Sequence, residues 1–285
     1  MIKKANKIKV LAIFAMVGIS TFAGCIDRAT TVNVAGSSTV FPIAQQCAEI
    51  FNERHENIKV QIESPPSGSG GGIKALGKGG ADIADASRKV KDKERNDWPG
   101  CNFVDHVVAY DGVAIIVSKR IYDSGVTEFT NDQVKRIYLP AGNPDKITNW
   151  KEVGGPDKKI NVNEREIGSG TRDTFMEVIF GDEDAETGAT QSWNANANVK
   201  TAVKNADNAI GYVGLGYTGS DTPAVKLNGI ECTRENIKSG EYPISRSLHM
   251  YTDGDATGPV REFIDLVLSE EGQAMVEKEG FIKVG

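Results

Sequence analysis

One stretch of the chain combines an arginine with a turn of small residues at a predicted helix start. In NEREIGSGTRDTFMEVIF, residues 163–180, Arg165 stands just before Gly168–Thr171, and apolar residues then recur at helical spacing. A helix N-terminus offers unpaired N–H groups and partial positive charge, and arginine adds a fork of charged donors. The pattern predicts an oxyanion site. The alternative is an ordinary helix cap beside an arginine paired with Glu164 or Glu166. The predicted buried face of the helix is Phe175, Val178 and Ile179.

Two further strand-to-helix junctions are rich in glycine and hydroxyl residues. Ser37, Ser38 and Thr39 follow the predicted strand TVNVAG, and helix capping explains these hydroxyls on its own. The second junction, Ser67–Gly72, has too much glycine for a plain cap, and its place between a predicted strand and a predicted helix disfavours a flexible linker. Glycine lets backbone N–H groups come close to a ligand, and serine adds a hydroxyl donor. This junction therefore favours ligand contact.

The chain lacks the patterns of a catalytic centre. The segment IGSGT has no first glycine of the G-x-S-x-G turn that presents a nucleophilic serine. None of the three histidines stands in the context of a general base, and no spacing of Cys, His and Asp matches a metal site. Residues 72–78 match most of a nucleotide-binding P-loop, but Gly79 occupies the position that requires Ser or Thr. We therefore predict a binding protein rather than an enzyme, with no metal and no cofactor.

The N-terminal segment has the layout of a secretory signal. Four lysines in the first nine residues precede an uncharged, largely apolar stretch from Val10 to Gly24, which is shorter than the ~20 residues that a membrane span needs. FAGC resembles a lipobox, with Phe22 where that pattern prefers Leu, and it predicts cleavage before Cys25 and lipidation of that residue. Loss of the four lysines takes the formal net charge from −6 to −10. The overall field therefore does not recruit anions, and an anion site must work by local geometry.

Length and composition limit the architecture. The chain has 285 residues, 39% of them apolar and 25% charged, which is typical of a folded soluble protein and more than one core comfortably holds. From about Ala29 the predicted strands and helices alternate, so we expect two α/β lobes. The apolar run HVVAYDGVAIIVS, residues 106–118, is long enough to pass between them. Export permits disulfides, and Cys47, Cys101 and Cys232 allow at most one.

An ordered series of segments closely resembles the phosphate-binding proteins of ABC-type phosphate importers. The segments are AGSSTVFPIAQ, GSGGGIK, DIADASR, DGVAIIV, ITNWKEVGG, EREIGSGTRDTF, AIGYVGLGY, YPISRSLHMYT and SEEGQAMVEKEGF. The resemblance covers essentially everything after Cys25. It implies an α/β, two-lobed fold of the periplasmic-binding-protein class (type II), in which two crossing strands join the lobes and phosphate lies dehydrated in the cleft between them.

The resemblance also implies how the chain is divided. The expected parts are 1–24 as signal peptide, 25–29 as lipidated tether, 30–112 plus 247–285 as lobe 1, and 113–246 as lobe 2. The implied crossings between lobes lie near Asp111-Gly112 and near Ser245 to Leu248.

The family's phosphate-binding positions are carried over residue by residue. They fall on Thr39 with Ser38 beside it, the N–H of Val40, Ser69, Arg165, Ser169, Gly170 and Thr171. The family's usual aspartate two residues after the arginine is replaced by Ile167, so another group must hold the arginine.

One departure bears on specificity. The family's aspartate that accepts a hydrogen bond from the proton of hydrogen phosphate is replaced by Ser87, which Arg88 follows. Asp111 or Asp85 could supply the missing acceptor, although Asp111 could equally be a turn residue before a glycine. Arg88 could be a second cationic grip on the ligand, or could pair with Asp111.

The implied function is capture of inorganic phosphate outside the cytoplasm and delivery to an ABC-type permease complex in the membrane. The protein is expected to be a monomer, exported and anchored to the outer face of the cell membrane through lipidated Cys25, with no nucleic-acid partner. Because the hydroxyl of Ser87 does not repel fully ionised sulfate, a binding protein for sulfate, molybdate or tungstate is an alternative. An exported phosphate-ester hydrolase is the alternative from a different class.

Overall fold

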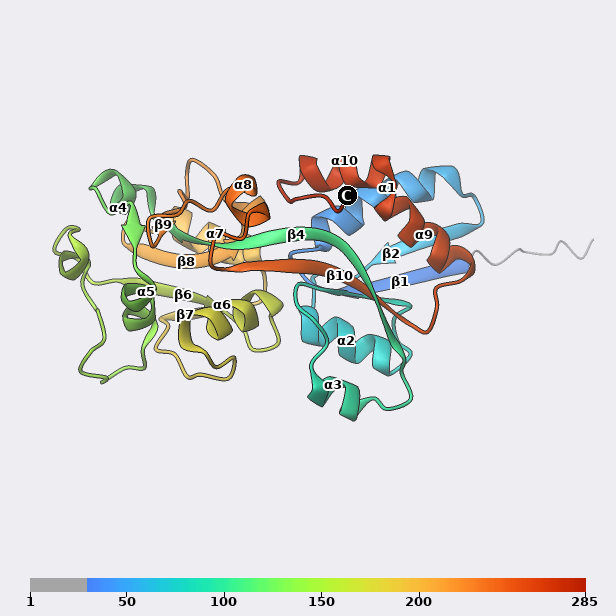
Figure 1. Ribbon diagram of the computed structural model, residues 1–285, viewed down its shortest axis with the longest axis horizontal. Helices are drawn as coiled ribbons and strands as arrows, with labels where there is room; N and C mark the ends of the chain where they lie inside the picture. The colour runs from blue at the N-terminus through green and yellow to red at the C-terminus, as the bar shows by residue number, and fades with distance from the viewer. Residues whose placement is uncertain (1–29) are drawn as a thin grey trace, which may run out of the picture.

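The structure, a computed structural model, describes residues 30–285 as two lobes joined by two long strands (Figure 1). The predicted signal peptide, the tether and the lipidation residue Cys25 lie outside the described residues. Within residues 30–285, no helix combines the length and the hydropathy that crossing a membrane requires.

One mixed sheet runs through both lobes. Its eight strands follow the order β2-β1-β3-β10-β4-β8-β6-β7, and β5 and β9 form a separate parallel pair. The strands of the described chain are β1 (Thr30–Gly36), β2 (Ile58–Ile62), β3 (Ile83–Ala86), β4 (Phe103–Val117), β5 (Glu128–Phe129), β6 (Asn161–Arg165), β7 (Gln191–Trp193), β8 (Ala209–Gly214), β9 (Lys226–Leu227) and β10 (Ser245–Asp253).

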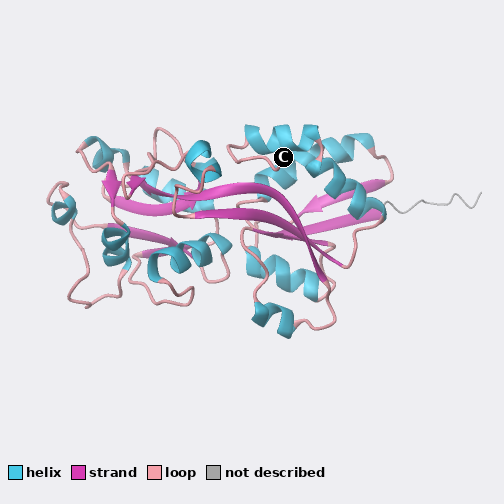
Figure 2. Ribbon diagram, in the orientation of Figure 1, coloured by secondary structure: helices cyan, strands magenta, loops and turns pink. Residues whose placement is uncertain are grey.

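Helices pack on both faces of this sheet (Figure 2). They are α1 (Phe41–Arg54), α2 (Ser69–Gly77), α3 (Asp92–Asp97), α4 (Lys119–Asp123), α5 (Asn131–Tyr138), α6 (Gly170–Phe180), α7 (Asn196–Asn205), α8 (Arg234–Lys238), α9 (Gly258–Leu268) and α10 (Glu270–Lys278), with 3₁₀ turns η1 (Trp150–Val153) and η2 (Leu215–Tyr217). In lobe 1, α1, α9 and α10 cover one face, and α2 and α3 lie on the other (Figure 1).

Strands β4 and β10 form the connection between the lobes. They pair antiparallel, and Asp111 lies directly opposite Arg246 in the register. Beyond that point β4 continues into lobe 2, where Val113–Val117 pairs with β8. The predicted two-lobed fold with two crossing strands is thus confirmed, and its crossing residues carry charged side chains into the hinge.

Each lobe has its own hydrophobic core. The lobe 1 core joins β1 and β2 to α1, α9 and α10, and the lobe 2 core contains Phe175 and Tyr212, whose rings stack at 4.0 Å. The predicted buried face of α6 is correct for Phe175 and Ile179, but Met176 is buried and Val178 is only half-buried. The lobe boundaries stay a prediction. Ile282, which that prediction assigns to lobe 1, packs in the lobe 2 core.

The three cysteines of the described chain are free thiols rather than a disulfide pair and a single thiol. Cys47 and Cys232 are buried and Cys101 is half-buried. Burial raises the pKa of the Cys47 thiol to about 12, so this group is an inert part of the lobe 1 core at neutral pH.

Glycines at the end of β1 and in the first turn of α2 allow an unusually close approach of backbone segments. A Cβ atom on Gly72 would lie 2.4 Å from the carbonyl oxygen of Ala35, and one on Gly36, where φ is +132°, would lie 2.3 Å from that of Asp85. Only glycine fits these positions. The start of α2 therefore sits directly on β1 and β3, and this placement brings Ser69 beside Ser87.

Candidate functional site

A buried ion pair lies at the hinge between the lobes. Arg246 donates from Nε and Nη2 to one oxygen of Asp111, at 3.0 and 2.7 Å, and the N–H of Leu215 donates to the other oxygen at 2.9 Å. Burial raises the pKa of Asp111 above its ordinary value, and the charge of Arg246 opposes that shift. Asp111 is therefore a strand residue that anchors an arginine; it is not a turn residue and does not pair with Arg88.

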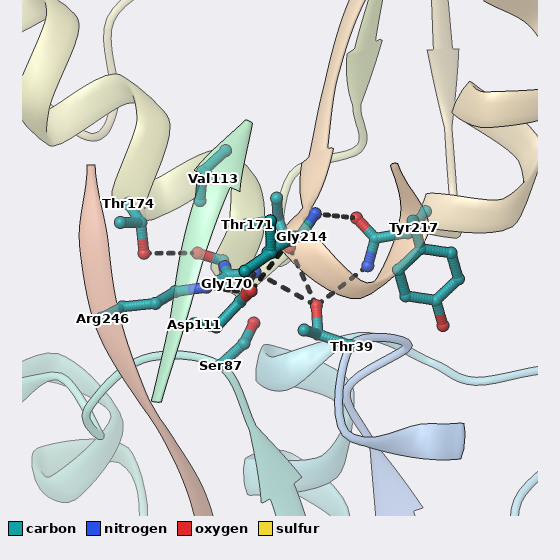
Figure 3. Close-up of polar contacts among 12 residues, drawn as sticks. Thr39, Ser87, Asp111, Val113, Gly170, Thr171, Thr174, Gly214, Tyr217 and Arg246 are labelled. Carbon is teal, nitrogen blue, oxygen red and sulfur yellow. Dashed lines mark hydrogen bonds and ion pairs between the residues drawn. The ribbon is translucent and has the colours of Figure 1, made fainter. Parts of the chain in front are cut away.

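Groups from both lobes converge on the hydroxyl of Thr39 (Figure 3). Thr39 lies just before α1 in lobe 1, and its Oγ1 is 3.1 Å from Oγ1 of Thr171 in the first turn of α6. Asn196, the first residue of α7, donates to the same oxygen at 2.9 Å, and Nη2 of Arg246 donates at 3.3 Å. Three helix N-termini and the hinge thus meet at one point, which is an arrangement suited to a small anion.

A second contact between the lobes lies beside the first. The N–H of Ser87 donates to Oγ of Ser69 at 3.0 Å, and the two hydroxyl oxygens are 3.3 Å apart. A Cβ atom on Gly170 would lie 2.5 Å from Oγ of Ser69 and 2.6 Å from Oγ of Ser87. In Figure 3 Ser87 points from lobe 1 toward Gly170. The start of α6 therefore rests on both serine hydroxyls, and no larger residue fits there in this lobe arrangement.

Arg165 is a buried cation held by carbonyl oxygens. It is 1% exposed, and its Nε and Nη2 donate to the carbonyls of Trp193 and Asn194 at 3.1 and 2.7 Å. Its backbone N–H donates to the hydroxyl of Tyr212 at 3.1 Å. The group that replaces the family's aspartate is therefore main-chain oxygen, and Ile167 in the aspartate's place is 89% exposed.

Two buried arginine donors have no hydrogen-bond partner among the described residues. They are Nη1 of Arg165 and Nη1 of Arg246. Burial lowers the pKa of Arg165 to about 10, and electrostatic repulsion by Arg246 contributes to the shift. The two guanidinium groups therefore lie close enough to interact. Arg165 remains protonated at neutral pH. Burial of a cation without an acidic partner costs several kcal/mol, and an anion bound beside Arg165 would offset that cost.

The remaining predicted site residues have partners of their own. Oγ of Ser38 accepts from Nδ2 of Asn196 at 3.3 Å, and the N–H of Val40 points to Oγ of Ser37 at 3.4 Å. Ser169 caps α6, because its Oγ accepts from the N–H of Arg172 at 3.3 Å. The last of these contacts supports the reading of Ser169 as an ordinary helix cap.

Arg88 is the predicted site residue whose geometry disagrees most with its predicted role. Its Nε donates to Asp173 at 2.7 Å, and Nη1 and Nη2 donate to the two oxygens of Glu94 at 2.7 and 2.8 Å. The prediction that Arg88 is a second cationic contact to the ligand is therefore corrected, because its guanidinium already donates to these two carboxylates.

Asp85 is buried within lobe 1. Its Oδ1 has no partner in the described chain, and burial raises its pKa well above the ordinary value.

Sequence reasoning missed Arg246 and Asn196. Arg246 lies in the segment YPISRSLHMYT, where a charged residue inside an otherwise predicted crossing strand could have indicated a role at the hinge. Asn196 stands at a helix start in lobe 2, as Thr171 does, but its surrounding WNANANV has no glycine to mark it. In the described chain no group of three or more His, Cys, Asp or Glu could hold a metal ion.

Comparison with known proteins identifies the family. A family model described as a PBP superfamily domain matches residues 26–271. The phosphate-binding protein PstS of Bacillus subtilis is 33% identical over 256 residues, which cover 89% of this chain and 81% of the relative. The chain belongs to the PstS family of phosphate-binding proteins. The resemblance read from the ordered sequence motifs is thereby confirmed.

Solved structures of PstS-like proteins share the fold. A structure from Clostridium perfringens, described as a phosphate ABC transporter substrate-binding protein with bound phosphate, has a TM-score of 0.80 and 36% identity, covering 90% of this chain and 100% of the other. An ABC-type phosphate transport receptor from Vibrio cholerae has a TM-score of 0.71 and 30% identity, covering 89% and 100%. These relatives are named as binding and transport proteins, in agreement with the prediction that the PstS-family chain is not an enzyme.

Proposed function

We propose that this protein captures inorganic phosphate between its two lobes and delivers it to an ABC-type import permease. The observation that carries the proposal is the pair of buried Nη1 donors of Arg165 and Arg246, which have no partner within residues 30–285 and lie beside hydroxyls from both lobes. The names of the PstS relatives identify phosphate as the anion that such a site takes.

The proposed ligand contacts come from both sides of the cleft. Lobe 1 supplies the hydroxyls of Thr39, Ser69 and Ser87, and lobe 2 supplies Thr171 with the N-terminal N–H groups of α6. Arg165 and Arg246 provide the positive charge, and Asn196 orients Thr39. Each charge-assisted hydrogen bond contributes about 1.5–3 kcal/mol, so several must act together to reach the roughly 8 kcal/mol that corresponds to a micromolar dissociation constant.

Closure of the lobes is part of the proposed mechanism. The hydroxyls of Thr39 and Thr171 belong to different lobes yet lie 3.1 Å apart, so these groups surround a ligand only when the cleft is shut. Closure excludes water, which strengthens each bond to the anion. The closed lobes then present the surface that the permease recognises. Release requires reopening, because the site residues are buried in the closed form.

Another tetrahedral oxyanion is the second candidate ligand. Ser87 carries no charge, and the carboxylate of Asp111 is neutralised by Arg246 at 2.7 Å. No free carboxylate among the proposed contacts repels fully ionised sulfate. Phosphate selectivity would then rest on hydroxyl oxygens, which accept a hydrogen bond from the P–OH group of hydrogen phosphate without rejecting sulfate strongly.

A competition titration tests the ligand. The purified chain lacking residues 1–24 is titrated with phosphate by calorimetry at several pH values from 5 to 9, alone and with excess sulfate or molybdate. The expected result is binding of phosphate that persists with sulfate in excess. Displacement by equimolar sulfate or molybdate would transfer the proposal to that anion, and absence of binding by all three would reject an oxyanion site.

We also propose export and anchoring from the N-terminal sequence. Residues 1–24 are cleaved as a signal peptide, and Cys25 carries the lipid that holds a monomer at the outer face of the membrane. Replacement of Cys25 by alanine should release the protein from the membrane fraction into the medium or the periplasm. Retention of that variant in the membrane fraction contradicts a lipid anchor at this residue.

A further inference from the structure

A cluster of charged side chains joins the two lobes beside the candidate site. Arg88 and Lys91 follow β3 in lobe 1, and Asp173 and Glu183 belong to α6 and the loop after it in lobe 2. Arg88 is 2.7 Å from Asp173, and Lys91 is 3.1 Å from Asp173 and 3.0 Å from Glu183. These four residues with Glu94 are called the inter-lobe ion cluster below.

The lobe 1 half of the cluster is fixed in place before lobe 2 contributes. Glu94 binds both terminal nitrogens of Arg88, and it also accepts from the backbone N–H of Lys91 at 2.9 Å. Burial lowers the pKa of Arg88, but Glu94 and Asp173 outweigh that effect and raise it above the ordinary value. A preorganised guanidinium loses little freedom when Asp173 arrives, so its bond is stronger than that between two mobile surface chains.

The charges on the two halves are complementary. In lobe 1, Arg88 and Lys91 outweigh Glu94 by one positive charge, and Asp173 and Glu183 give lobe 2 two negative charges. The side chains of Arg88 and Asp173 are only 9% and 6% exposed, whereas those of Lys91 and Glu183 are 26% and 38% exposed. The inner pair is thus partly shielded from solvent, and the outer pair lies in reach of salt ions.

The cluster is separate from the proposed ligand contacts but mechanically tied to them. Arg88 directly follows Ser87, and Asp173 lies two residues after Thr171 on α6. A cavity of about 450 Å³ borders the cluster and extends to His249 on the hinge strand β10. The charged groups therefore pull together the segments that carry the hydroxyls, without themselves pointing at the ligand.

We propose that the inter-lobe ion cluster is an electrostatic latch, which favours the closed lobes and slows ligand release. Arg88, Lys91, Asp173 and Glu183 act as positioning residues whose bonds break each time the cleft opens. The latch adds to the neighbouring backbone contact, in which the N–H of Gly70 in lobe 1 donates to the carbonyl of Gly168 in lobe 2 at 2.9 Å. Its effect on affinity rests on the proposed phosphate binding, whereas its effect on closure does not.

Release kinetics test the latch. Asp173→Asn and Lys91→Met are compared with the unaltered protein by stopped-flow measurement of phosphate association and dissociation at 20 mM and 500 mM NaCl. We expect dissociation about tenfold faster in Asp173→Asn and about threefold faster in Lys91→Met, with association changed less than threefold. Added salt should speed release from the unaltered protein and affect Lys91→Met much less, because that variant lacks the exposed outer pair.

A matched control is the pair Lys151 and Asp157. Its atoms are also 3.1 Å apart, but both residues lie in lobe 2, so Lys151→Met should leave dissociation unchanged. Unaltered dissociation in both Asp173→Asn and Lys91→Met would overturn the latch.

Small-angle X-ray scattering without phosphate separates the latch from the proposed function. If the cluster favours closure, Asp173→Asn has a larger radius of gyration than the unaltered protein in low salt, whether or not phosphate is the ligand. Equal radii in low salt together with equal release rates contradict the proposal. A larger radius in the variant with no phosphate binding by either protein would reject phosphate as ligand and retain the latch.

Discussion

Replacement of Arg165 by methionine separates ligand binding from folding. Methionine retains much of the aliphatic volume and removes the charge. The Nη1 donor, which has no partner among the described residues, is lost for the ligand, while the carbonyls of Trp193 and Asn194 lose their donors. Binding and stability therefore depend on different bonds of one side chain.

The size of each effect follows from those bonds. One charge-assisted hydrogen bond contributes about 1.5–3 kcal/mol, and 1.4 kcal/mol corresponds to a tenfold change, so phosphate affinity should fall about 10- to 150-fold. The two carbonyls left without a donor cost about 1 kcal/mol each. Removal of a buried, unpaired cation offsets that cost. The free energy of unfolding without phosphate should therefore change by less than about 2 kcal/mol.

Calorimetry for phosphate and urea unfolding measure the two quantities on the same preparation. Arg172→Met is the matched control, because Arg172 is 7% exposed and also donates to two carbonyls, those of Glu183 at 3.0 Å and Ala185 at 3.1 Å. It should lose stability and keep its phosphate affinity within about threefold. Near-native affinity in a folded Arg165→Met protein refutes the site, and an equal loss in both variants shows that any buried arginine matters.

Three further perturbations follow from the geometry. Gly170→Ala places a Cβ atom 2.5 and 2.6 Å from two serine hydroxyls of lobe 1. Calorimetry should therefore show phosphate affinity at least tenfold weaker, with unchanged thermal unfolding. Unchanged phosphate affinity would mean that the lobes do not close in the arrangement described above. Arg246→Met leaves Asp111 buried without its cation, so the free energy of unfolding in urea should fall by about 3–5 kcal/mol. Adding Asp111→Asn should restore this stability but not the phosphate affinity. Restored phosphate affinity in the double variant excludes Arg246 as a ligand contact. Burial raises the pKa of Asp85, and the charge of Glu63 raises it further. The contribution of Asp85 to stability is therefore present below its unfolded pKa of ~3.9 and is lost as pH rises through its folded pKa. Urea unfolding should show Asp85→Asn gaining more stability over the unaltered chain at pH 8 than at pH 5, and equal gains at the two pH values contradict this.

Local sequence patterns predicted the parts of the site whose residues lie close together in one segment of the chain. Arg165 and the small residues before α6 are close in sequence, so their junction was recognisable without the fold. The same holds for Ser69, whose glycine-rich surroundings reflect the close packing of α2 on β1. These features depend on short-range backbone geometry, which residue types largely determine.

The parts of the site that the sequence did not predict depend on contacts between residues far apart in the chain. Arg246 reaches the site only because β10 pairs with β4, and its partner Asp111 is 135 residues away. Arg88 has two acidic partners in the fold, neither of which was predicted, and one of them, Asp173, lies 85 residues further along the chain. The partners of Arg246 and Arg88 follow from strand order and lobe closure.

Lobe closure and anion binding are coupled through charge. Arg165 and Arg246 lie within electrostatic reach of each other, and one donor on each has no partner in the described chain. Their repulsion favours an anion beside them, and the complementary charges of the inter-lobe ion cluster favour closure. A bound anion contacts the hydroxyls of both lobes only when the lobes are shut, so it shifts the balance by its differential affinity for the closed form. A stronger latch raises affinity by stabilising the closed form without ligand, and it slows release for the same reason. Because transport requires release, the partial exposure of Lys91 and Glu183 keeps the latch weak enough to open.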